Sequence, residues 1–163
     1  GVLYAGIMVT ESGPKVLEFN CRFGDPETQV ILPRIKGDLI PALMACVDGT
    51  LSERLIEWKP SACVCVVMAS GGYPGSYQKG KAVTGLAEAA KLDDIAVFHA
   101  GTKLDSGQVV TSGGRVLGVT AVDETLEKAI KKAYFAVTRI SFDQCQYRTD
   151  IGAKAVRRLQ SRA

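Results

Sequence analysis

The hydrophobic residues at the start of the chain predict a β-hairpin. Residues 1–10, GVLYAGIMVT, are apolar at odd and even positions alike, which is typical of a central strand covered on both faces. A turn at residues 11–14 precedes a returning strand from Lys15 to Cys21, in which Leu17, Phe19 and Cys21 are expected to point into apolar packing. Because the chain opens inside a strand of this kind, we expect it to be shortened at its amino terminus.

Helical signals follow the hairpin. Asp25 and Pro26 predict a helix with Asp25 as its cap and Pro26 at its first position. Pro33 is expected to bend or end this helix, because proline removes one helical hydrogen bond. A second helix is predicted between Gly37 and Gly49, with one apolar face made by Leu39, Ile40, Leu43, Met44 and Val47.

From about Ala62 onward, short strands dominate the pattern. The stretches ACVCVVMAS, AVFHAGT, QVVT and RVLGVTAV are β-rich and are separated by turn residues. A helix is predicted after Asp123, its expected cap, and a last helix after Asp150. The first of these helices has a core face made by Leu126, Ala129, Ile130, Ala133, Tyr134 and Val137.

These elements predict an α/β protein with a seam near Lys59 and Pro60. Residues 1–60 are expected to form a mixed sheet with helices. Residues 61–163 are expected to form a smaller β-rich domain with one packed helix.

Composition narrows the class of protein. Apolar residues make up 47% and charged residues 23% of the chain, as in folded globular domains, and no apolar run reaches the roughly 18 residues of a membrane span. The net charge of +3 is too small to predict nucleic-acid binding, although the last helix carries the basic residues Lys154, Arg157, Arg158 and Arg162. The cysteines are five, an odd number, and four of them lie among apolar neighbours or in a predicted strand or helix, which indicates reduced thiols. We therefore expect a cytoplasmic protein that binds neither membranes nor nucleic acid.

The densest group of polar residues is LEFNCRFGDPETQ, from Leu17 to Gln29. Alternate residues of a strand share a face, so Glu18, Asn20 and Arg22 are expected to point the same way. A carboxylate and an amide oxygen two residues apart suit one Mg²⁺ whose other ligands are substrate phosphates, and a guanidinium suits phosphate oxygens. The pattern favours a site for a metal-bound polyphosphate, with a solvated face of an edge strand as the alternative.

The segment KVLEFNCRFGDPETQVILP resembles the magnesium-binding segment of the glycinamide ribonucleotide synthetases, or phosphoribosylamine–glycine ligases, which are ATP-grasp enzymes. The stretches VVMASGGYPG, VFHAGT, TSGGRVLGVTA and YRTDIG resemble the carboxy-terminal domain of that family, in the same order. The resemblance implies that residues 1–60 are the carboxy-terminal part of the ATP-grasp domain. Residues 61–163 then correspond to the family's carboxy-terminal domain, which resembles a barrel sandwich.

The resemblance also implies an activity in purine biosynthesis. In this family ATP phosphorylates the carboxylate of glycine, and the amine of 5-phosphoribosylamine attacks the glycyl phosphate to give glycinamide ribonucleotide, ADP and phosphate. Glu18 and Asn20 look like the ligands of Mg²⁺ or Mn²⁺, and Arg22 is expected to stabilise the transferring phosphoryl group. Asp25 and Glu27 are weaker candidates for orienting the substrate amine.

Two later arginines have structural alternatives to a ligand role. Arg115 follows the glycine pair Gly113-Gly114 and is a candidate contact for the ribose phosphate, although a glycine pair before a strand also fits a plain hairpin turn. For Arg148 we expect a salt bridge with Asp150, which is also expected to cap the last helix.

Several alternatives stay open at this point. Many ATP-grasp enzymes have a further acidic metal ligand about a dozen residues before the Glu-x-Asn pair, where this chain has Ala5-Gly6, so a second metal is doubtful. The family's amino-terminal domains have no counterpart in the chain, so we expect these domains as partners and no turnover by the chain alone. Another ATP-grasp ligase and a non-catalytic docking module remain alternative functions.

Overall fold

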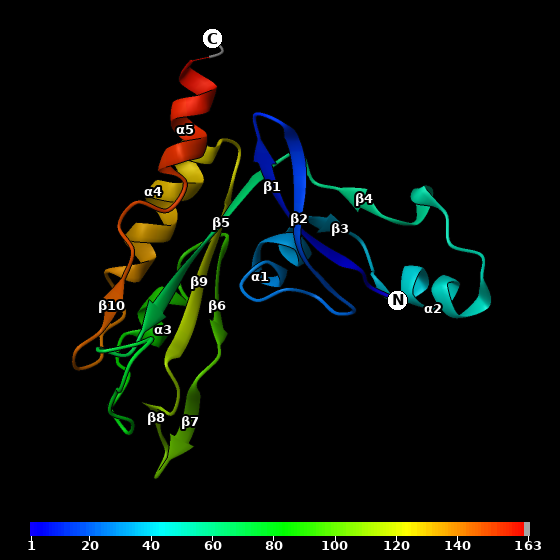
Figure 1. Cartoon of the computed structure of the whole chain (residues 1–163). Helices are drawn as coiled ribbons and strands as arrows, with labels where there is room; N and C mark the ends of the chain where they lie inside the picture. Colours follow the sequence, from blue (N-terminus) through cyan, green and yellow to red (C-terminus); the bar gives the residue numbers. More distant parts are fainter. Residues whose placement is uncertain (162–163) are drawn as a thin grey trace. The chain divides into compact units, whose positions relative to one another are not determined.

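The computed structural model describes residues 1–161, and the chain falls into two compact units that meet in sequence at Lys59 and Pro60. The first unit begins with the antiparallel hairpin of β1 and β2 (Figure 1). A short antiparallel pair, β3 with β4, joins the ends of its helical region. Its elements are β1 (Tyr4–Thr10), β2 (Gly13–Asn20), α1 (Thr28–Ile31), the 3₁₀ turn η1 (Leu32–Arg34), β3 (Ile35–Lys36), α2 (Ile40–Asp48), the 3₁₀ turn η2 (Glu53–Leu55) and β4 (Glu57–Trp58).

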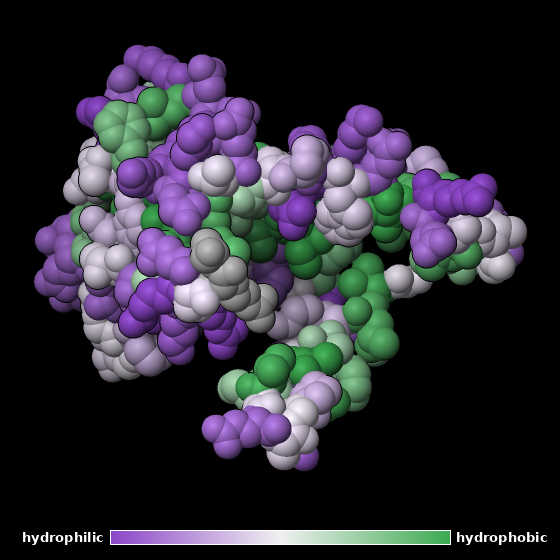
Figure 2. Space-filling view, turned by 90° about the horizontal axis from the view of Figure 1, so that it is seen from above, coloured by the Kyte–Doolittle hydropathy of each residue, from purple (hydrophilic) through white to green (hydrophobic). Residues whose placement is uncertain are grey.

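The hairpin is far more exposed than its hydrophobic pattern predicts. Strand β1 pairs only with β2, so the prediction of a central strand covered on both faces is wrong for the described residues. Leu17 is 64% exposed and Phe19 62%, and Cys21 is exposed as well, so the apolar packing expected around them is also absent there. Figure 2 shows broad hydrophobic surface, in green, on the first unit, whereas the second unit is mostly purple and white.

The first helix is shorter than predicted and begins later. It starts at Thr28, and Asp25 does not cap it, because the side chain of Asp25 accepts a hydrogen bond from Nε2 of Gln29 instead. The helix ends before the 3₁₀ turn that contains Pro33, as expected.

The second helix, α2, starts and stops as predicted but buries a different face. The side chain of Asp38 accepts from the backbone N–H of Ile40, and Gly49 ends the helix in the left-handed conformation. Its buried positions are Ala42 and Ala45, so the predicted apolar face is only partly correct. Ile40, Met44 and Val47 are exposed.

The second unit is an antiparallel sheet of four strands in the order β10-β5-β9-β6 (Figure 1). The hairpin of β7 and β8 forms a separate two-stranded sheet. The strands are β5 (Ala62–Ala69), β6 (Ile95–His99), β7 (Thr102–Asp105), β8 (Gln108–Thr111), β9 (Arg115–Asp123) and β10 (Gln146–Tyr147), and the helices are α3 (Leu86–Ala89), α4 (Leu126–Val137) and α5 (Ala153–Gln160). The α/β class and the predicted strands of this region are confirmed, and every strand pairing among residues 1–161 is antiparallel.

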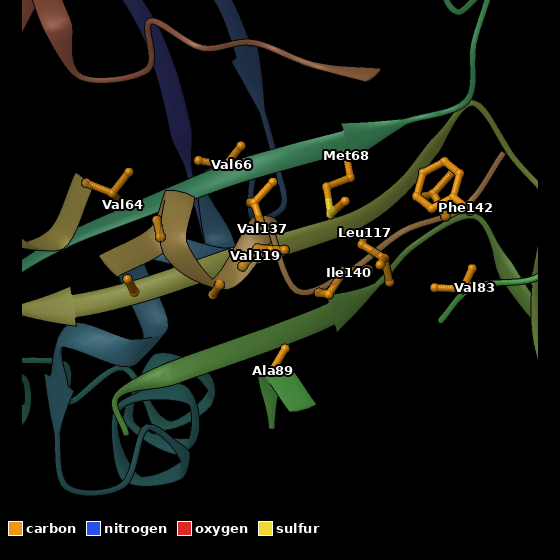
Figure 3. Packing of buried hydrophobic residues seen from close by; sticks show 14 of the residues in the cluster. Val64, Val66, Met68, Val83, Ala89, Leu117, Val119, Val137, Ile140 and Phe142 are labelled. Atoms are coloured by element: carbon orange, nitrogen blue, oxygen red, sulfur yellow. The ribbon is translucent and has the colours of Figure 1, made fainter. Parts of the chain in front are cut away.

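Helix α4 covers one face of this sheet and closes the core. Alternate side chains of β5 point toward the helix, namely Val64, Val66 and Met68 (Figure 3). The partners Leu117 and Val119 on β9 lie on the same face, and α4 contributes small residues that allow close approach. The predicted core face of α4 is confirmed, with Ala129, Ala133 and Val137 buried and Leu126, Ile130 and Tyr134 packed beside them.

The start of α4 differs from the prediction by two residues. Thr125 is the cap, with its Oγ1 accepting from the backbone N–H of Lys128 at 3.2 Å. Asp123 instead ends β9, where its carboxylate lies 2.9 Å from Nζ of Lys132. The hydrogen bond from Lys132 is the main cause that lowers the pKa of Asp123.

The last helix, α5, follows Asp150 as predicted and is polar on its outside. Lys154, Arg157 and Arg158 are exposed, whereas Arg162 lies outside the described residues. Gly152, not Asp150, occupies the cap position of this helix, so that expected cap is wrong. None of the helices within residues 1–161 has the length and apolar character needed to cross a bilayer.

Truncation of the core should destabilise the protein. Leu117 has no exposed surface, so Leu117→Ala should lower the free energy of unfolding by about 2–5 kcal/mol, through lost burial and the cavity that remains. Urea unfolding followed by far-ultraviolet circular dichroism measures this change. The matched variant Leu104→Ala removes a side chain that is 72% exposed on β7, and it should change stability by less than about 0.5 kcal/mol. Equal losses in the two variants would contradict the core described here.

Candidate functional site

One face of the β1-β2 hairpin collects the predicted metal ligands. Asn20 lies opposite Tyr4, and Glu18 lies opposite Gly6. Residues that are directly opposite in an antiparallel pair project from the same face, and so do residues two apart on one strand. Tyr4, Gly6, Glu18 and Asn20 therefore share a face. The shared face of Glu18 and Asn20 agrees with the sequence prediction.

Glu27 reaches this face from the turn before α1. The hydroxyl of Tyr4 donates to Oε1 of Glu27 at 3.3 Å. The negative charge of Glu27 is the main cause that raises the pKa of Tyr4, and the charge of Glu18 adds to it. The phenol of Tyr4 thus lies near two carboxylates that are nine residues apart in the chain.

Two glycines leave the space in which these carboxylates lie. A β-carbon on Gly24 would lie 2.5 Å from Oε2 of Glu27, and one on Gly6 would lie 3.1 Å from Cγ of Glu18. Gly24 is buried and Glu27 half-buried, so the carboxylate of Glu27 fills a closely fitting space. Any side chain on Gly24 would displace it.

Arg22 and Asp25 are not on the shared face of the strand. Strand β2 ends at Asn20, so the expectation that Arg22 continues its alternation is wrong. Arg22 lies in an exposed bend, and its Nη1 donates to the carbonyl of Phe23 at 2.9 Å. Asp25 is exposed and accepts from Gln29 at 2.9 Å. The four-residue helix α1 starts at Thr28, so the prediction that Pro26 is the first residue of a helix is wrong.

A cavity of about 470 Å³ in the second unit is lined by Arg115. Two aromatic side chains, Tyr73 and Tyr147, also line the cavity, together with Arg148 and Gln146. Nε2 of Gln146 donates to the carbonyl of Tyr73 at 2.7 Å, which joins two walls of the cavity. The cavity combines positive charge with aromatic and apolar surface, which is suited to a small anionic ligand.

The glycine pair before Arg115 serves close packing at this cavity. A β-carbon on Gly114 would overlap Cδ2 of Tyr73, so the ring of Tyr73 can lie against the backbone only because residue 114 is glycine. Arg115 follows as the first residue of β9 and is half-buried. The pair therefore does more than form a turn, because it also admits an aromatic wall next to Arg115.

Comparison with known proteins places the chain in a family. Residues 63–154 match the model of the phosphoribosylglycinamide synthetase C domain, and residues 1–28 match the ATP-grasp (A) domain of the same synthetase. The chain belongs to the phosphoribosylglycinamide synthetase family. The resemblance expected from the sequence motifs is thereby confirmed.

Individual members of the synthetase family are similar over nearly the whole chain. The phosphoribosylamine–glycine ligase of Synechocystis is 57% identical over 159 residues, which cover 96% of this chain and 38% of the relative. The trifunctional purine biosynthetic protein adenosine-3 of Gallus gallus is 56% identical over 96% of this chain and 16% of its own length. The crystal structure of the phosphoribosylamine–glycine ligase from Thermotoga maritima matches with a TM-score of 0.77 and 36% identity, over 91% of this chain and 36% of that one. The chain thus spans well under half of each of these relatives.

Some residues of these two candidate sites were not predicted from the sequence. Tyr4 stands in an apolar run that reads as core, and only the pairing with Asn20 places it at the site. Tyr73, Gln146 and Tyr147 reach the cavity from a loop and from β10, which are far from Arg115 in the chain. Gly6 lies within a run of mostly larger apolar residues, and this was the signal that could have indicated the site on the hairpin.

The arrangement around Tyr4 can be tested by titration. Tyr4 should ionise above the usual tyrosine pKa of about 10, because a carboxylate beside the phenol disfavours the phenolate. Glu27→Gln should lower the pKa of Tyr4 toward that value, and Glu18→Gln should lower it less. Nuclear magnetic resonance of ring-labelled tyrosine measures the titration. Glu53→Gln, an exposed site in the same unit, serves as the control and should leave the pKa of Tyr4 unchanged. An unchanged pKa in Glu27→Gln would show that the two side chains are apart in solution.

Proposed function

We propose that the chain supplies the metal-binding and carboxy-terminal parts of an ATP-dependent ligase that joins glycine to 5-phosphoribosylamine. The observation that carries this proposal is the shared face of Glu18 and Asn20 beside Tyr4 and Glu27. The relatives named as phosphoribosylamine–glycine ligases support the choice of substrates. The proposed reaction belongs to purine biosynthesis, as the name of the trifunctional relative indicates for that protein.

The donor chemistry of the hairpin face fits a hard divalent cation. Glu18 offers carboxylate oxygens, and Asn20 offers an amide oxygen on the same face. Glu18 and Asn20 would hold Mg²⁺ or Mn²⁺, and the bound cation would neutralise charge on the phosphates of ATP. Glu18 is exposed and Asn20 only half-buried, so both can reach a substrate that supplies the remaining oxygen ligands.

The other residues of this segment have roles in the two chemical steps. First the carboxylate of glycine attacks the γ-phosphorus of ATP and ADP leaves, and then the amine of 5-phosphoribosylamine attacks the acyl carbon and inorganic phosphate leaves. We assign Arg22 to stabilising charge on the transferred phosphoryl group, since its bend is exposed and the guanidinium can leave the carbonyl of Phe23. We assign Asp25 and Glu27 to orienting the substrate amine, with Glu27 the better placed because Tyr4 and Gly24 fix it.

The cavity of the second unit is assigned to the phosphate of 5-phosphoribosylamine. Arg115 is the residue that we expect to contact this phosphate, because a guanidinium binds phosphate oxygens in a bidentate manner. Its place at the first residue of β9 gives it a fixed backbone. This role stays a proposal for Arg115.

The remaining domains of the relatives are the proposed partners of the chain. The chain covers 38% of the Synechocystis relative, and we expect the region outside that match to contain the residues that bind ATP. Cys21, Cys46 and Cys145 are not in disulfides, which suits the reducing cytoplasm in which we expect the protein to act.

A chimaera provides the test of the proposed activity. In it, this chain replaces the matching region of the Synechocystis relative, and ADP release is measured with Mg²⁺-ATP, glycine and freshly generated 5-phosphoribosylamine. Release should require both substrates, stop with EDTA and return with Mg²⁺. Glu18→Ala and Asn20→Ala should each lower kcat/KM by roughly a hundredfold or more, because the phosphates lose their bound counter-charge.

The controls separate this function from its alternatives. Glu53→Ala removes an exposed carboxylate of the same unit and should leave the rate unchanged. Release with a different acid and amine would keep the ATP-grasp chemistry and remove the substrate assignment. A chimaera that is folded but releases no ADP with any pair would favour a non-catalytic docking module, and full activity in Glu18→Ala would overturn the metal site.

A further inference from the structure

The cavity beside Arg115 holds a second guanidinium, that of Arg148, whose position is fixed by contacts to both its side chain and its backbone. Arg115 and Arg148 come from different segments of the chain, the first from the start of β9 and the second from the residue after β10. Both line the same cavity of about 470 Å³. Two guanidinium groups on one small cavity suit an anion with several oxygen acceptors.

The side chain of Arg148 is held in place by Asp150. Nε of Arg148 donates to Oδ1 at 2.8 Å, and Nη2 donates to Oδ2 at 2.7 Å. This bidentate pair uses one edge of the planar guanidinium, and the two N–H groups of Nη1 take no part in it. A second acceptor can therefore bind Arg148 without breaking the pair.

The backbone of the same segment is held by Tyr134 of α4. The hydroxyl of Tyr134 donates to the carbonyl oxygen of Arg148 at 2.7 Å and accepts from the backbone N–H of Ile151 at 3.1 Å. The ring of Tyr134 also packs near that of Tyr147, with centroids 6.4 Å apart. Tyr134 itself is packed against the buried core. The segment around Arg148 thus contacts Tyr134 of α4 at three residues, namely Tyr147, Arg148 and Ile151.

The guanidinium groups select the class of ligand. Arg115 and Arg148 both present a guanidinium group to the cavity. A guanidinium recognises phosphate oxygens through paired hydrogen bonds, which favours a phosphate monoester over a neutral sugar. The rings of Tyr73 and Tyr147 supply apolar surface on which the uncharged part of such a ligand can pack.

We propose that Arg148 is a second phosphate-binding residue of this cavity, which accepts a sugar phosphate monoester between Arg148 and Arg115. Tyr134 and Asp150 are positioning residues that hold the guanidinium of Arg148 toward the ligand. This inference rests on the proposed function for the choice of a ribose phosphate, and it extends that function by a specificity-determining arginine that is predicted from the sequence only to make a salt bridge.

Binding to the 163-residue chain itself tests the inference. Ribose 5-phosphate is titrated against the isotope-labelled chain and followed by nuclear magnetic resonance, with ribose as the ligand that lacks the phosphate. We expect the amides around Arg115 and Arg148 to shift with ribose 5-phosphate and not with ribose. Arg148→Gln should weaken binding roughly tenfold or more, because a charge-assisted hydrogen bond is lost, and Arg148→Lys should recover part of it.

Matched variants separate a ligand role from a structural one. Arg158→Gln removes an exposed arginine of α5 outside the cavity lining and should bind like the unaltered chain. Tyr134→Phe keeps the ring but removes the hydroxyl, and should weaken binding severalfold. Thermal unfolding of each variant checks that the fold is kept. Unchanged affinity in Arg148→Gln, equal binding of ribose and ribose 5-phosphate, or no binding by the unaltered chain would each overturn the inference.

The Synechocystis chimaera distinguishes this inference from the proposed function. In it, Arg148→Gln should raise KM for 5-phosphoribosylamine roughly tenfold or more and leave KM for glycine and ATP unchanged. An active chimaera whose KM values do not respond to Arg148→Gln would overturn the inference and leave the ligase intact. The chimaera could instead be inactive while the chain binds ribose 5-phosphate in a way that Arg148→Gln weakens. That result would support the inference and contradict the proposed ligase function.

Discussion

The proposed metal site depends on one extra residue in the hairpin. From Thr10 opposite Gly13 to Ile7 opposite Val16 the pairing is regular, and the register then shifts by one so that Gly6 lies opposite Glu18. Had the first register continued, Tyr4 and Gly6 would lie opposite Phe19 and Leu17, and the oxygen donors would project from the other face. The bulge therefore brings Glu18 and Asn20 to the face of Tyr4, where Glu27 joins them. Bulges at functional sites commonly redirect side chains in this way.

In the second unit the central strand β9 has the corresponding role. It is paired on both sides, with β5 and with β6, and its residues from Val116 to Ala121 are buried, so its ends are fixed. Arg115 is the residue at which this strand begins, and Gly114 just before it admits the ring of Tyr73. Helix α4 packs on the same sheet and carries Tyr134, which holds the segment of Arg148. Both arginines are thus positioned from one packed core, although they are 33 positions apart in the chain.

The sequence predicted most elements because local pattern and local packing agree in them. The β-rich stretch of β5 and the helical period of α4 correspond to the two sides of one core, and the strand and the helix were both predicted correctly. The bulge could not be predicted, since a shift of one residue leaves a plausible alternation in either register. The burial of β1 was predicted wrongly. Apolar residues show that a strand can be buried, but burial needs neighbouring elements on its faces. Among the described residues, β1 pairs only with β2. From the sequence, Arg148 was expected only to form a salt bridge with Asp150. Its contact with Tyr134 and its place in the cavity depend on residues far away in the chain, so only the fold shows them.

The two groups of proposed ligand-binding residues rest on scaffolds of different strength. Glu18 and Asn20 lie on a two-stranded hairpin with largely exposed side chains, an arrangement that is marginally stable by itself. A cation that binds both residues only in the paired register would stabilise that register, because binding to the folded form alone shifts the equilibrium toward it. Arg115 begins a buried strand, and the backbone of Arg148 is hydrogen-bonded to Tyr134 on α4, before any ligand arrives. Metal binding is therefore expected to be coupled to order in the hairpin, whereas phosphate binding meets groups that are already in place, at a smaller cost in conformational entropy.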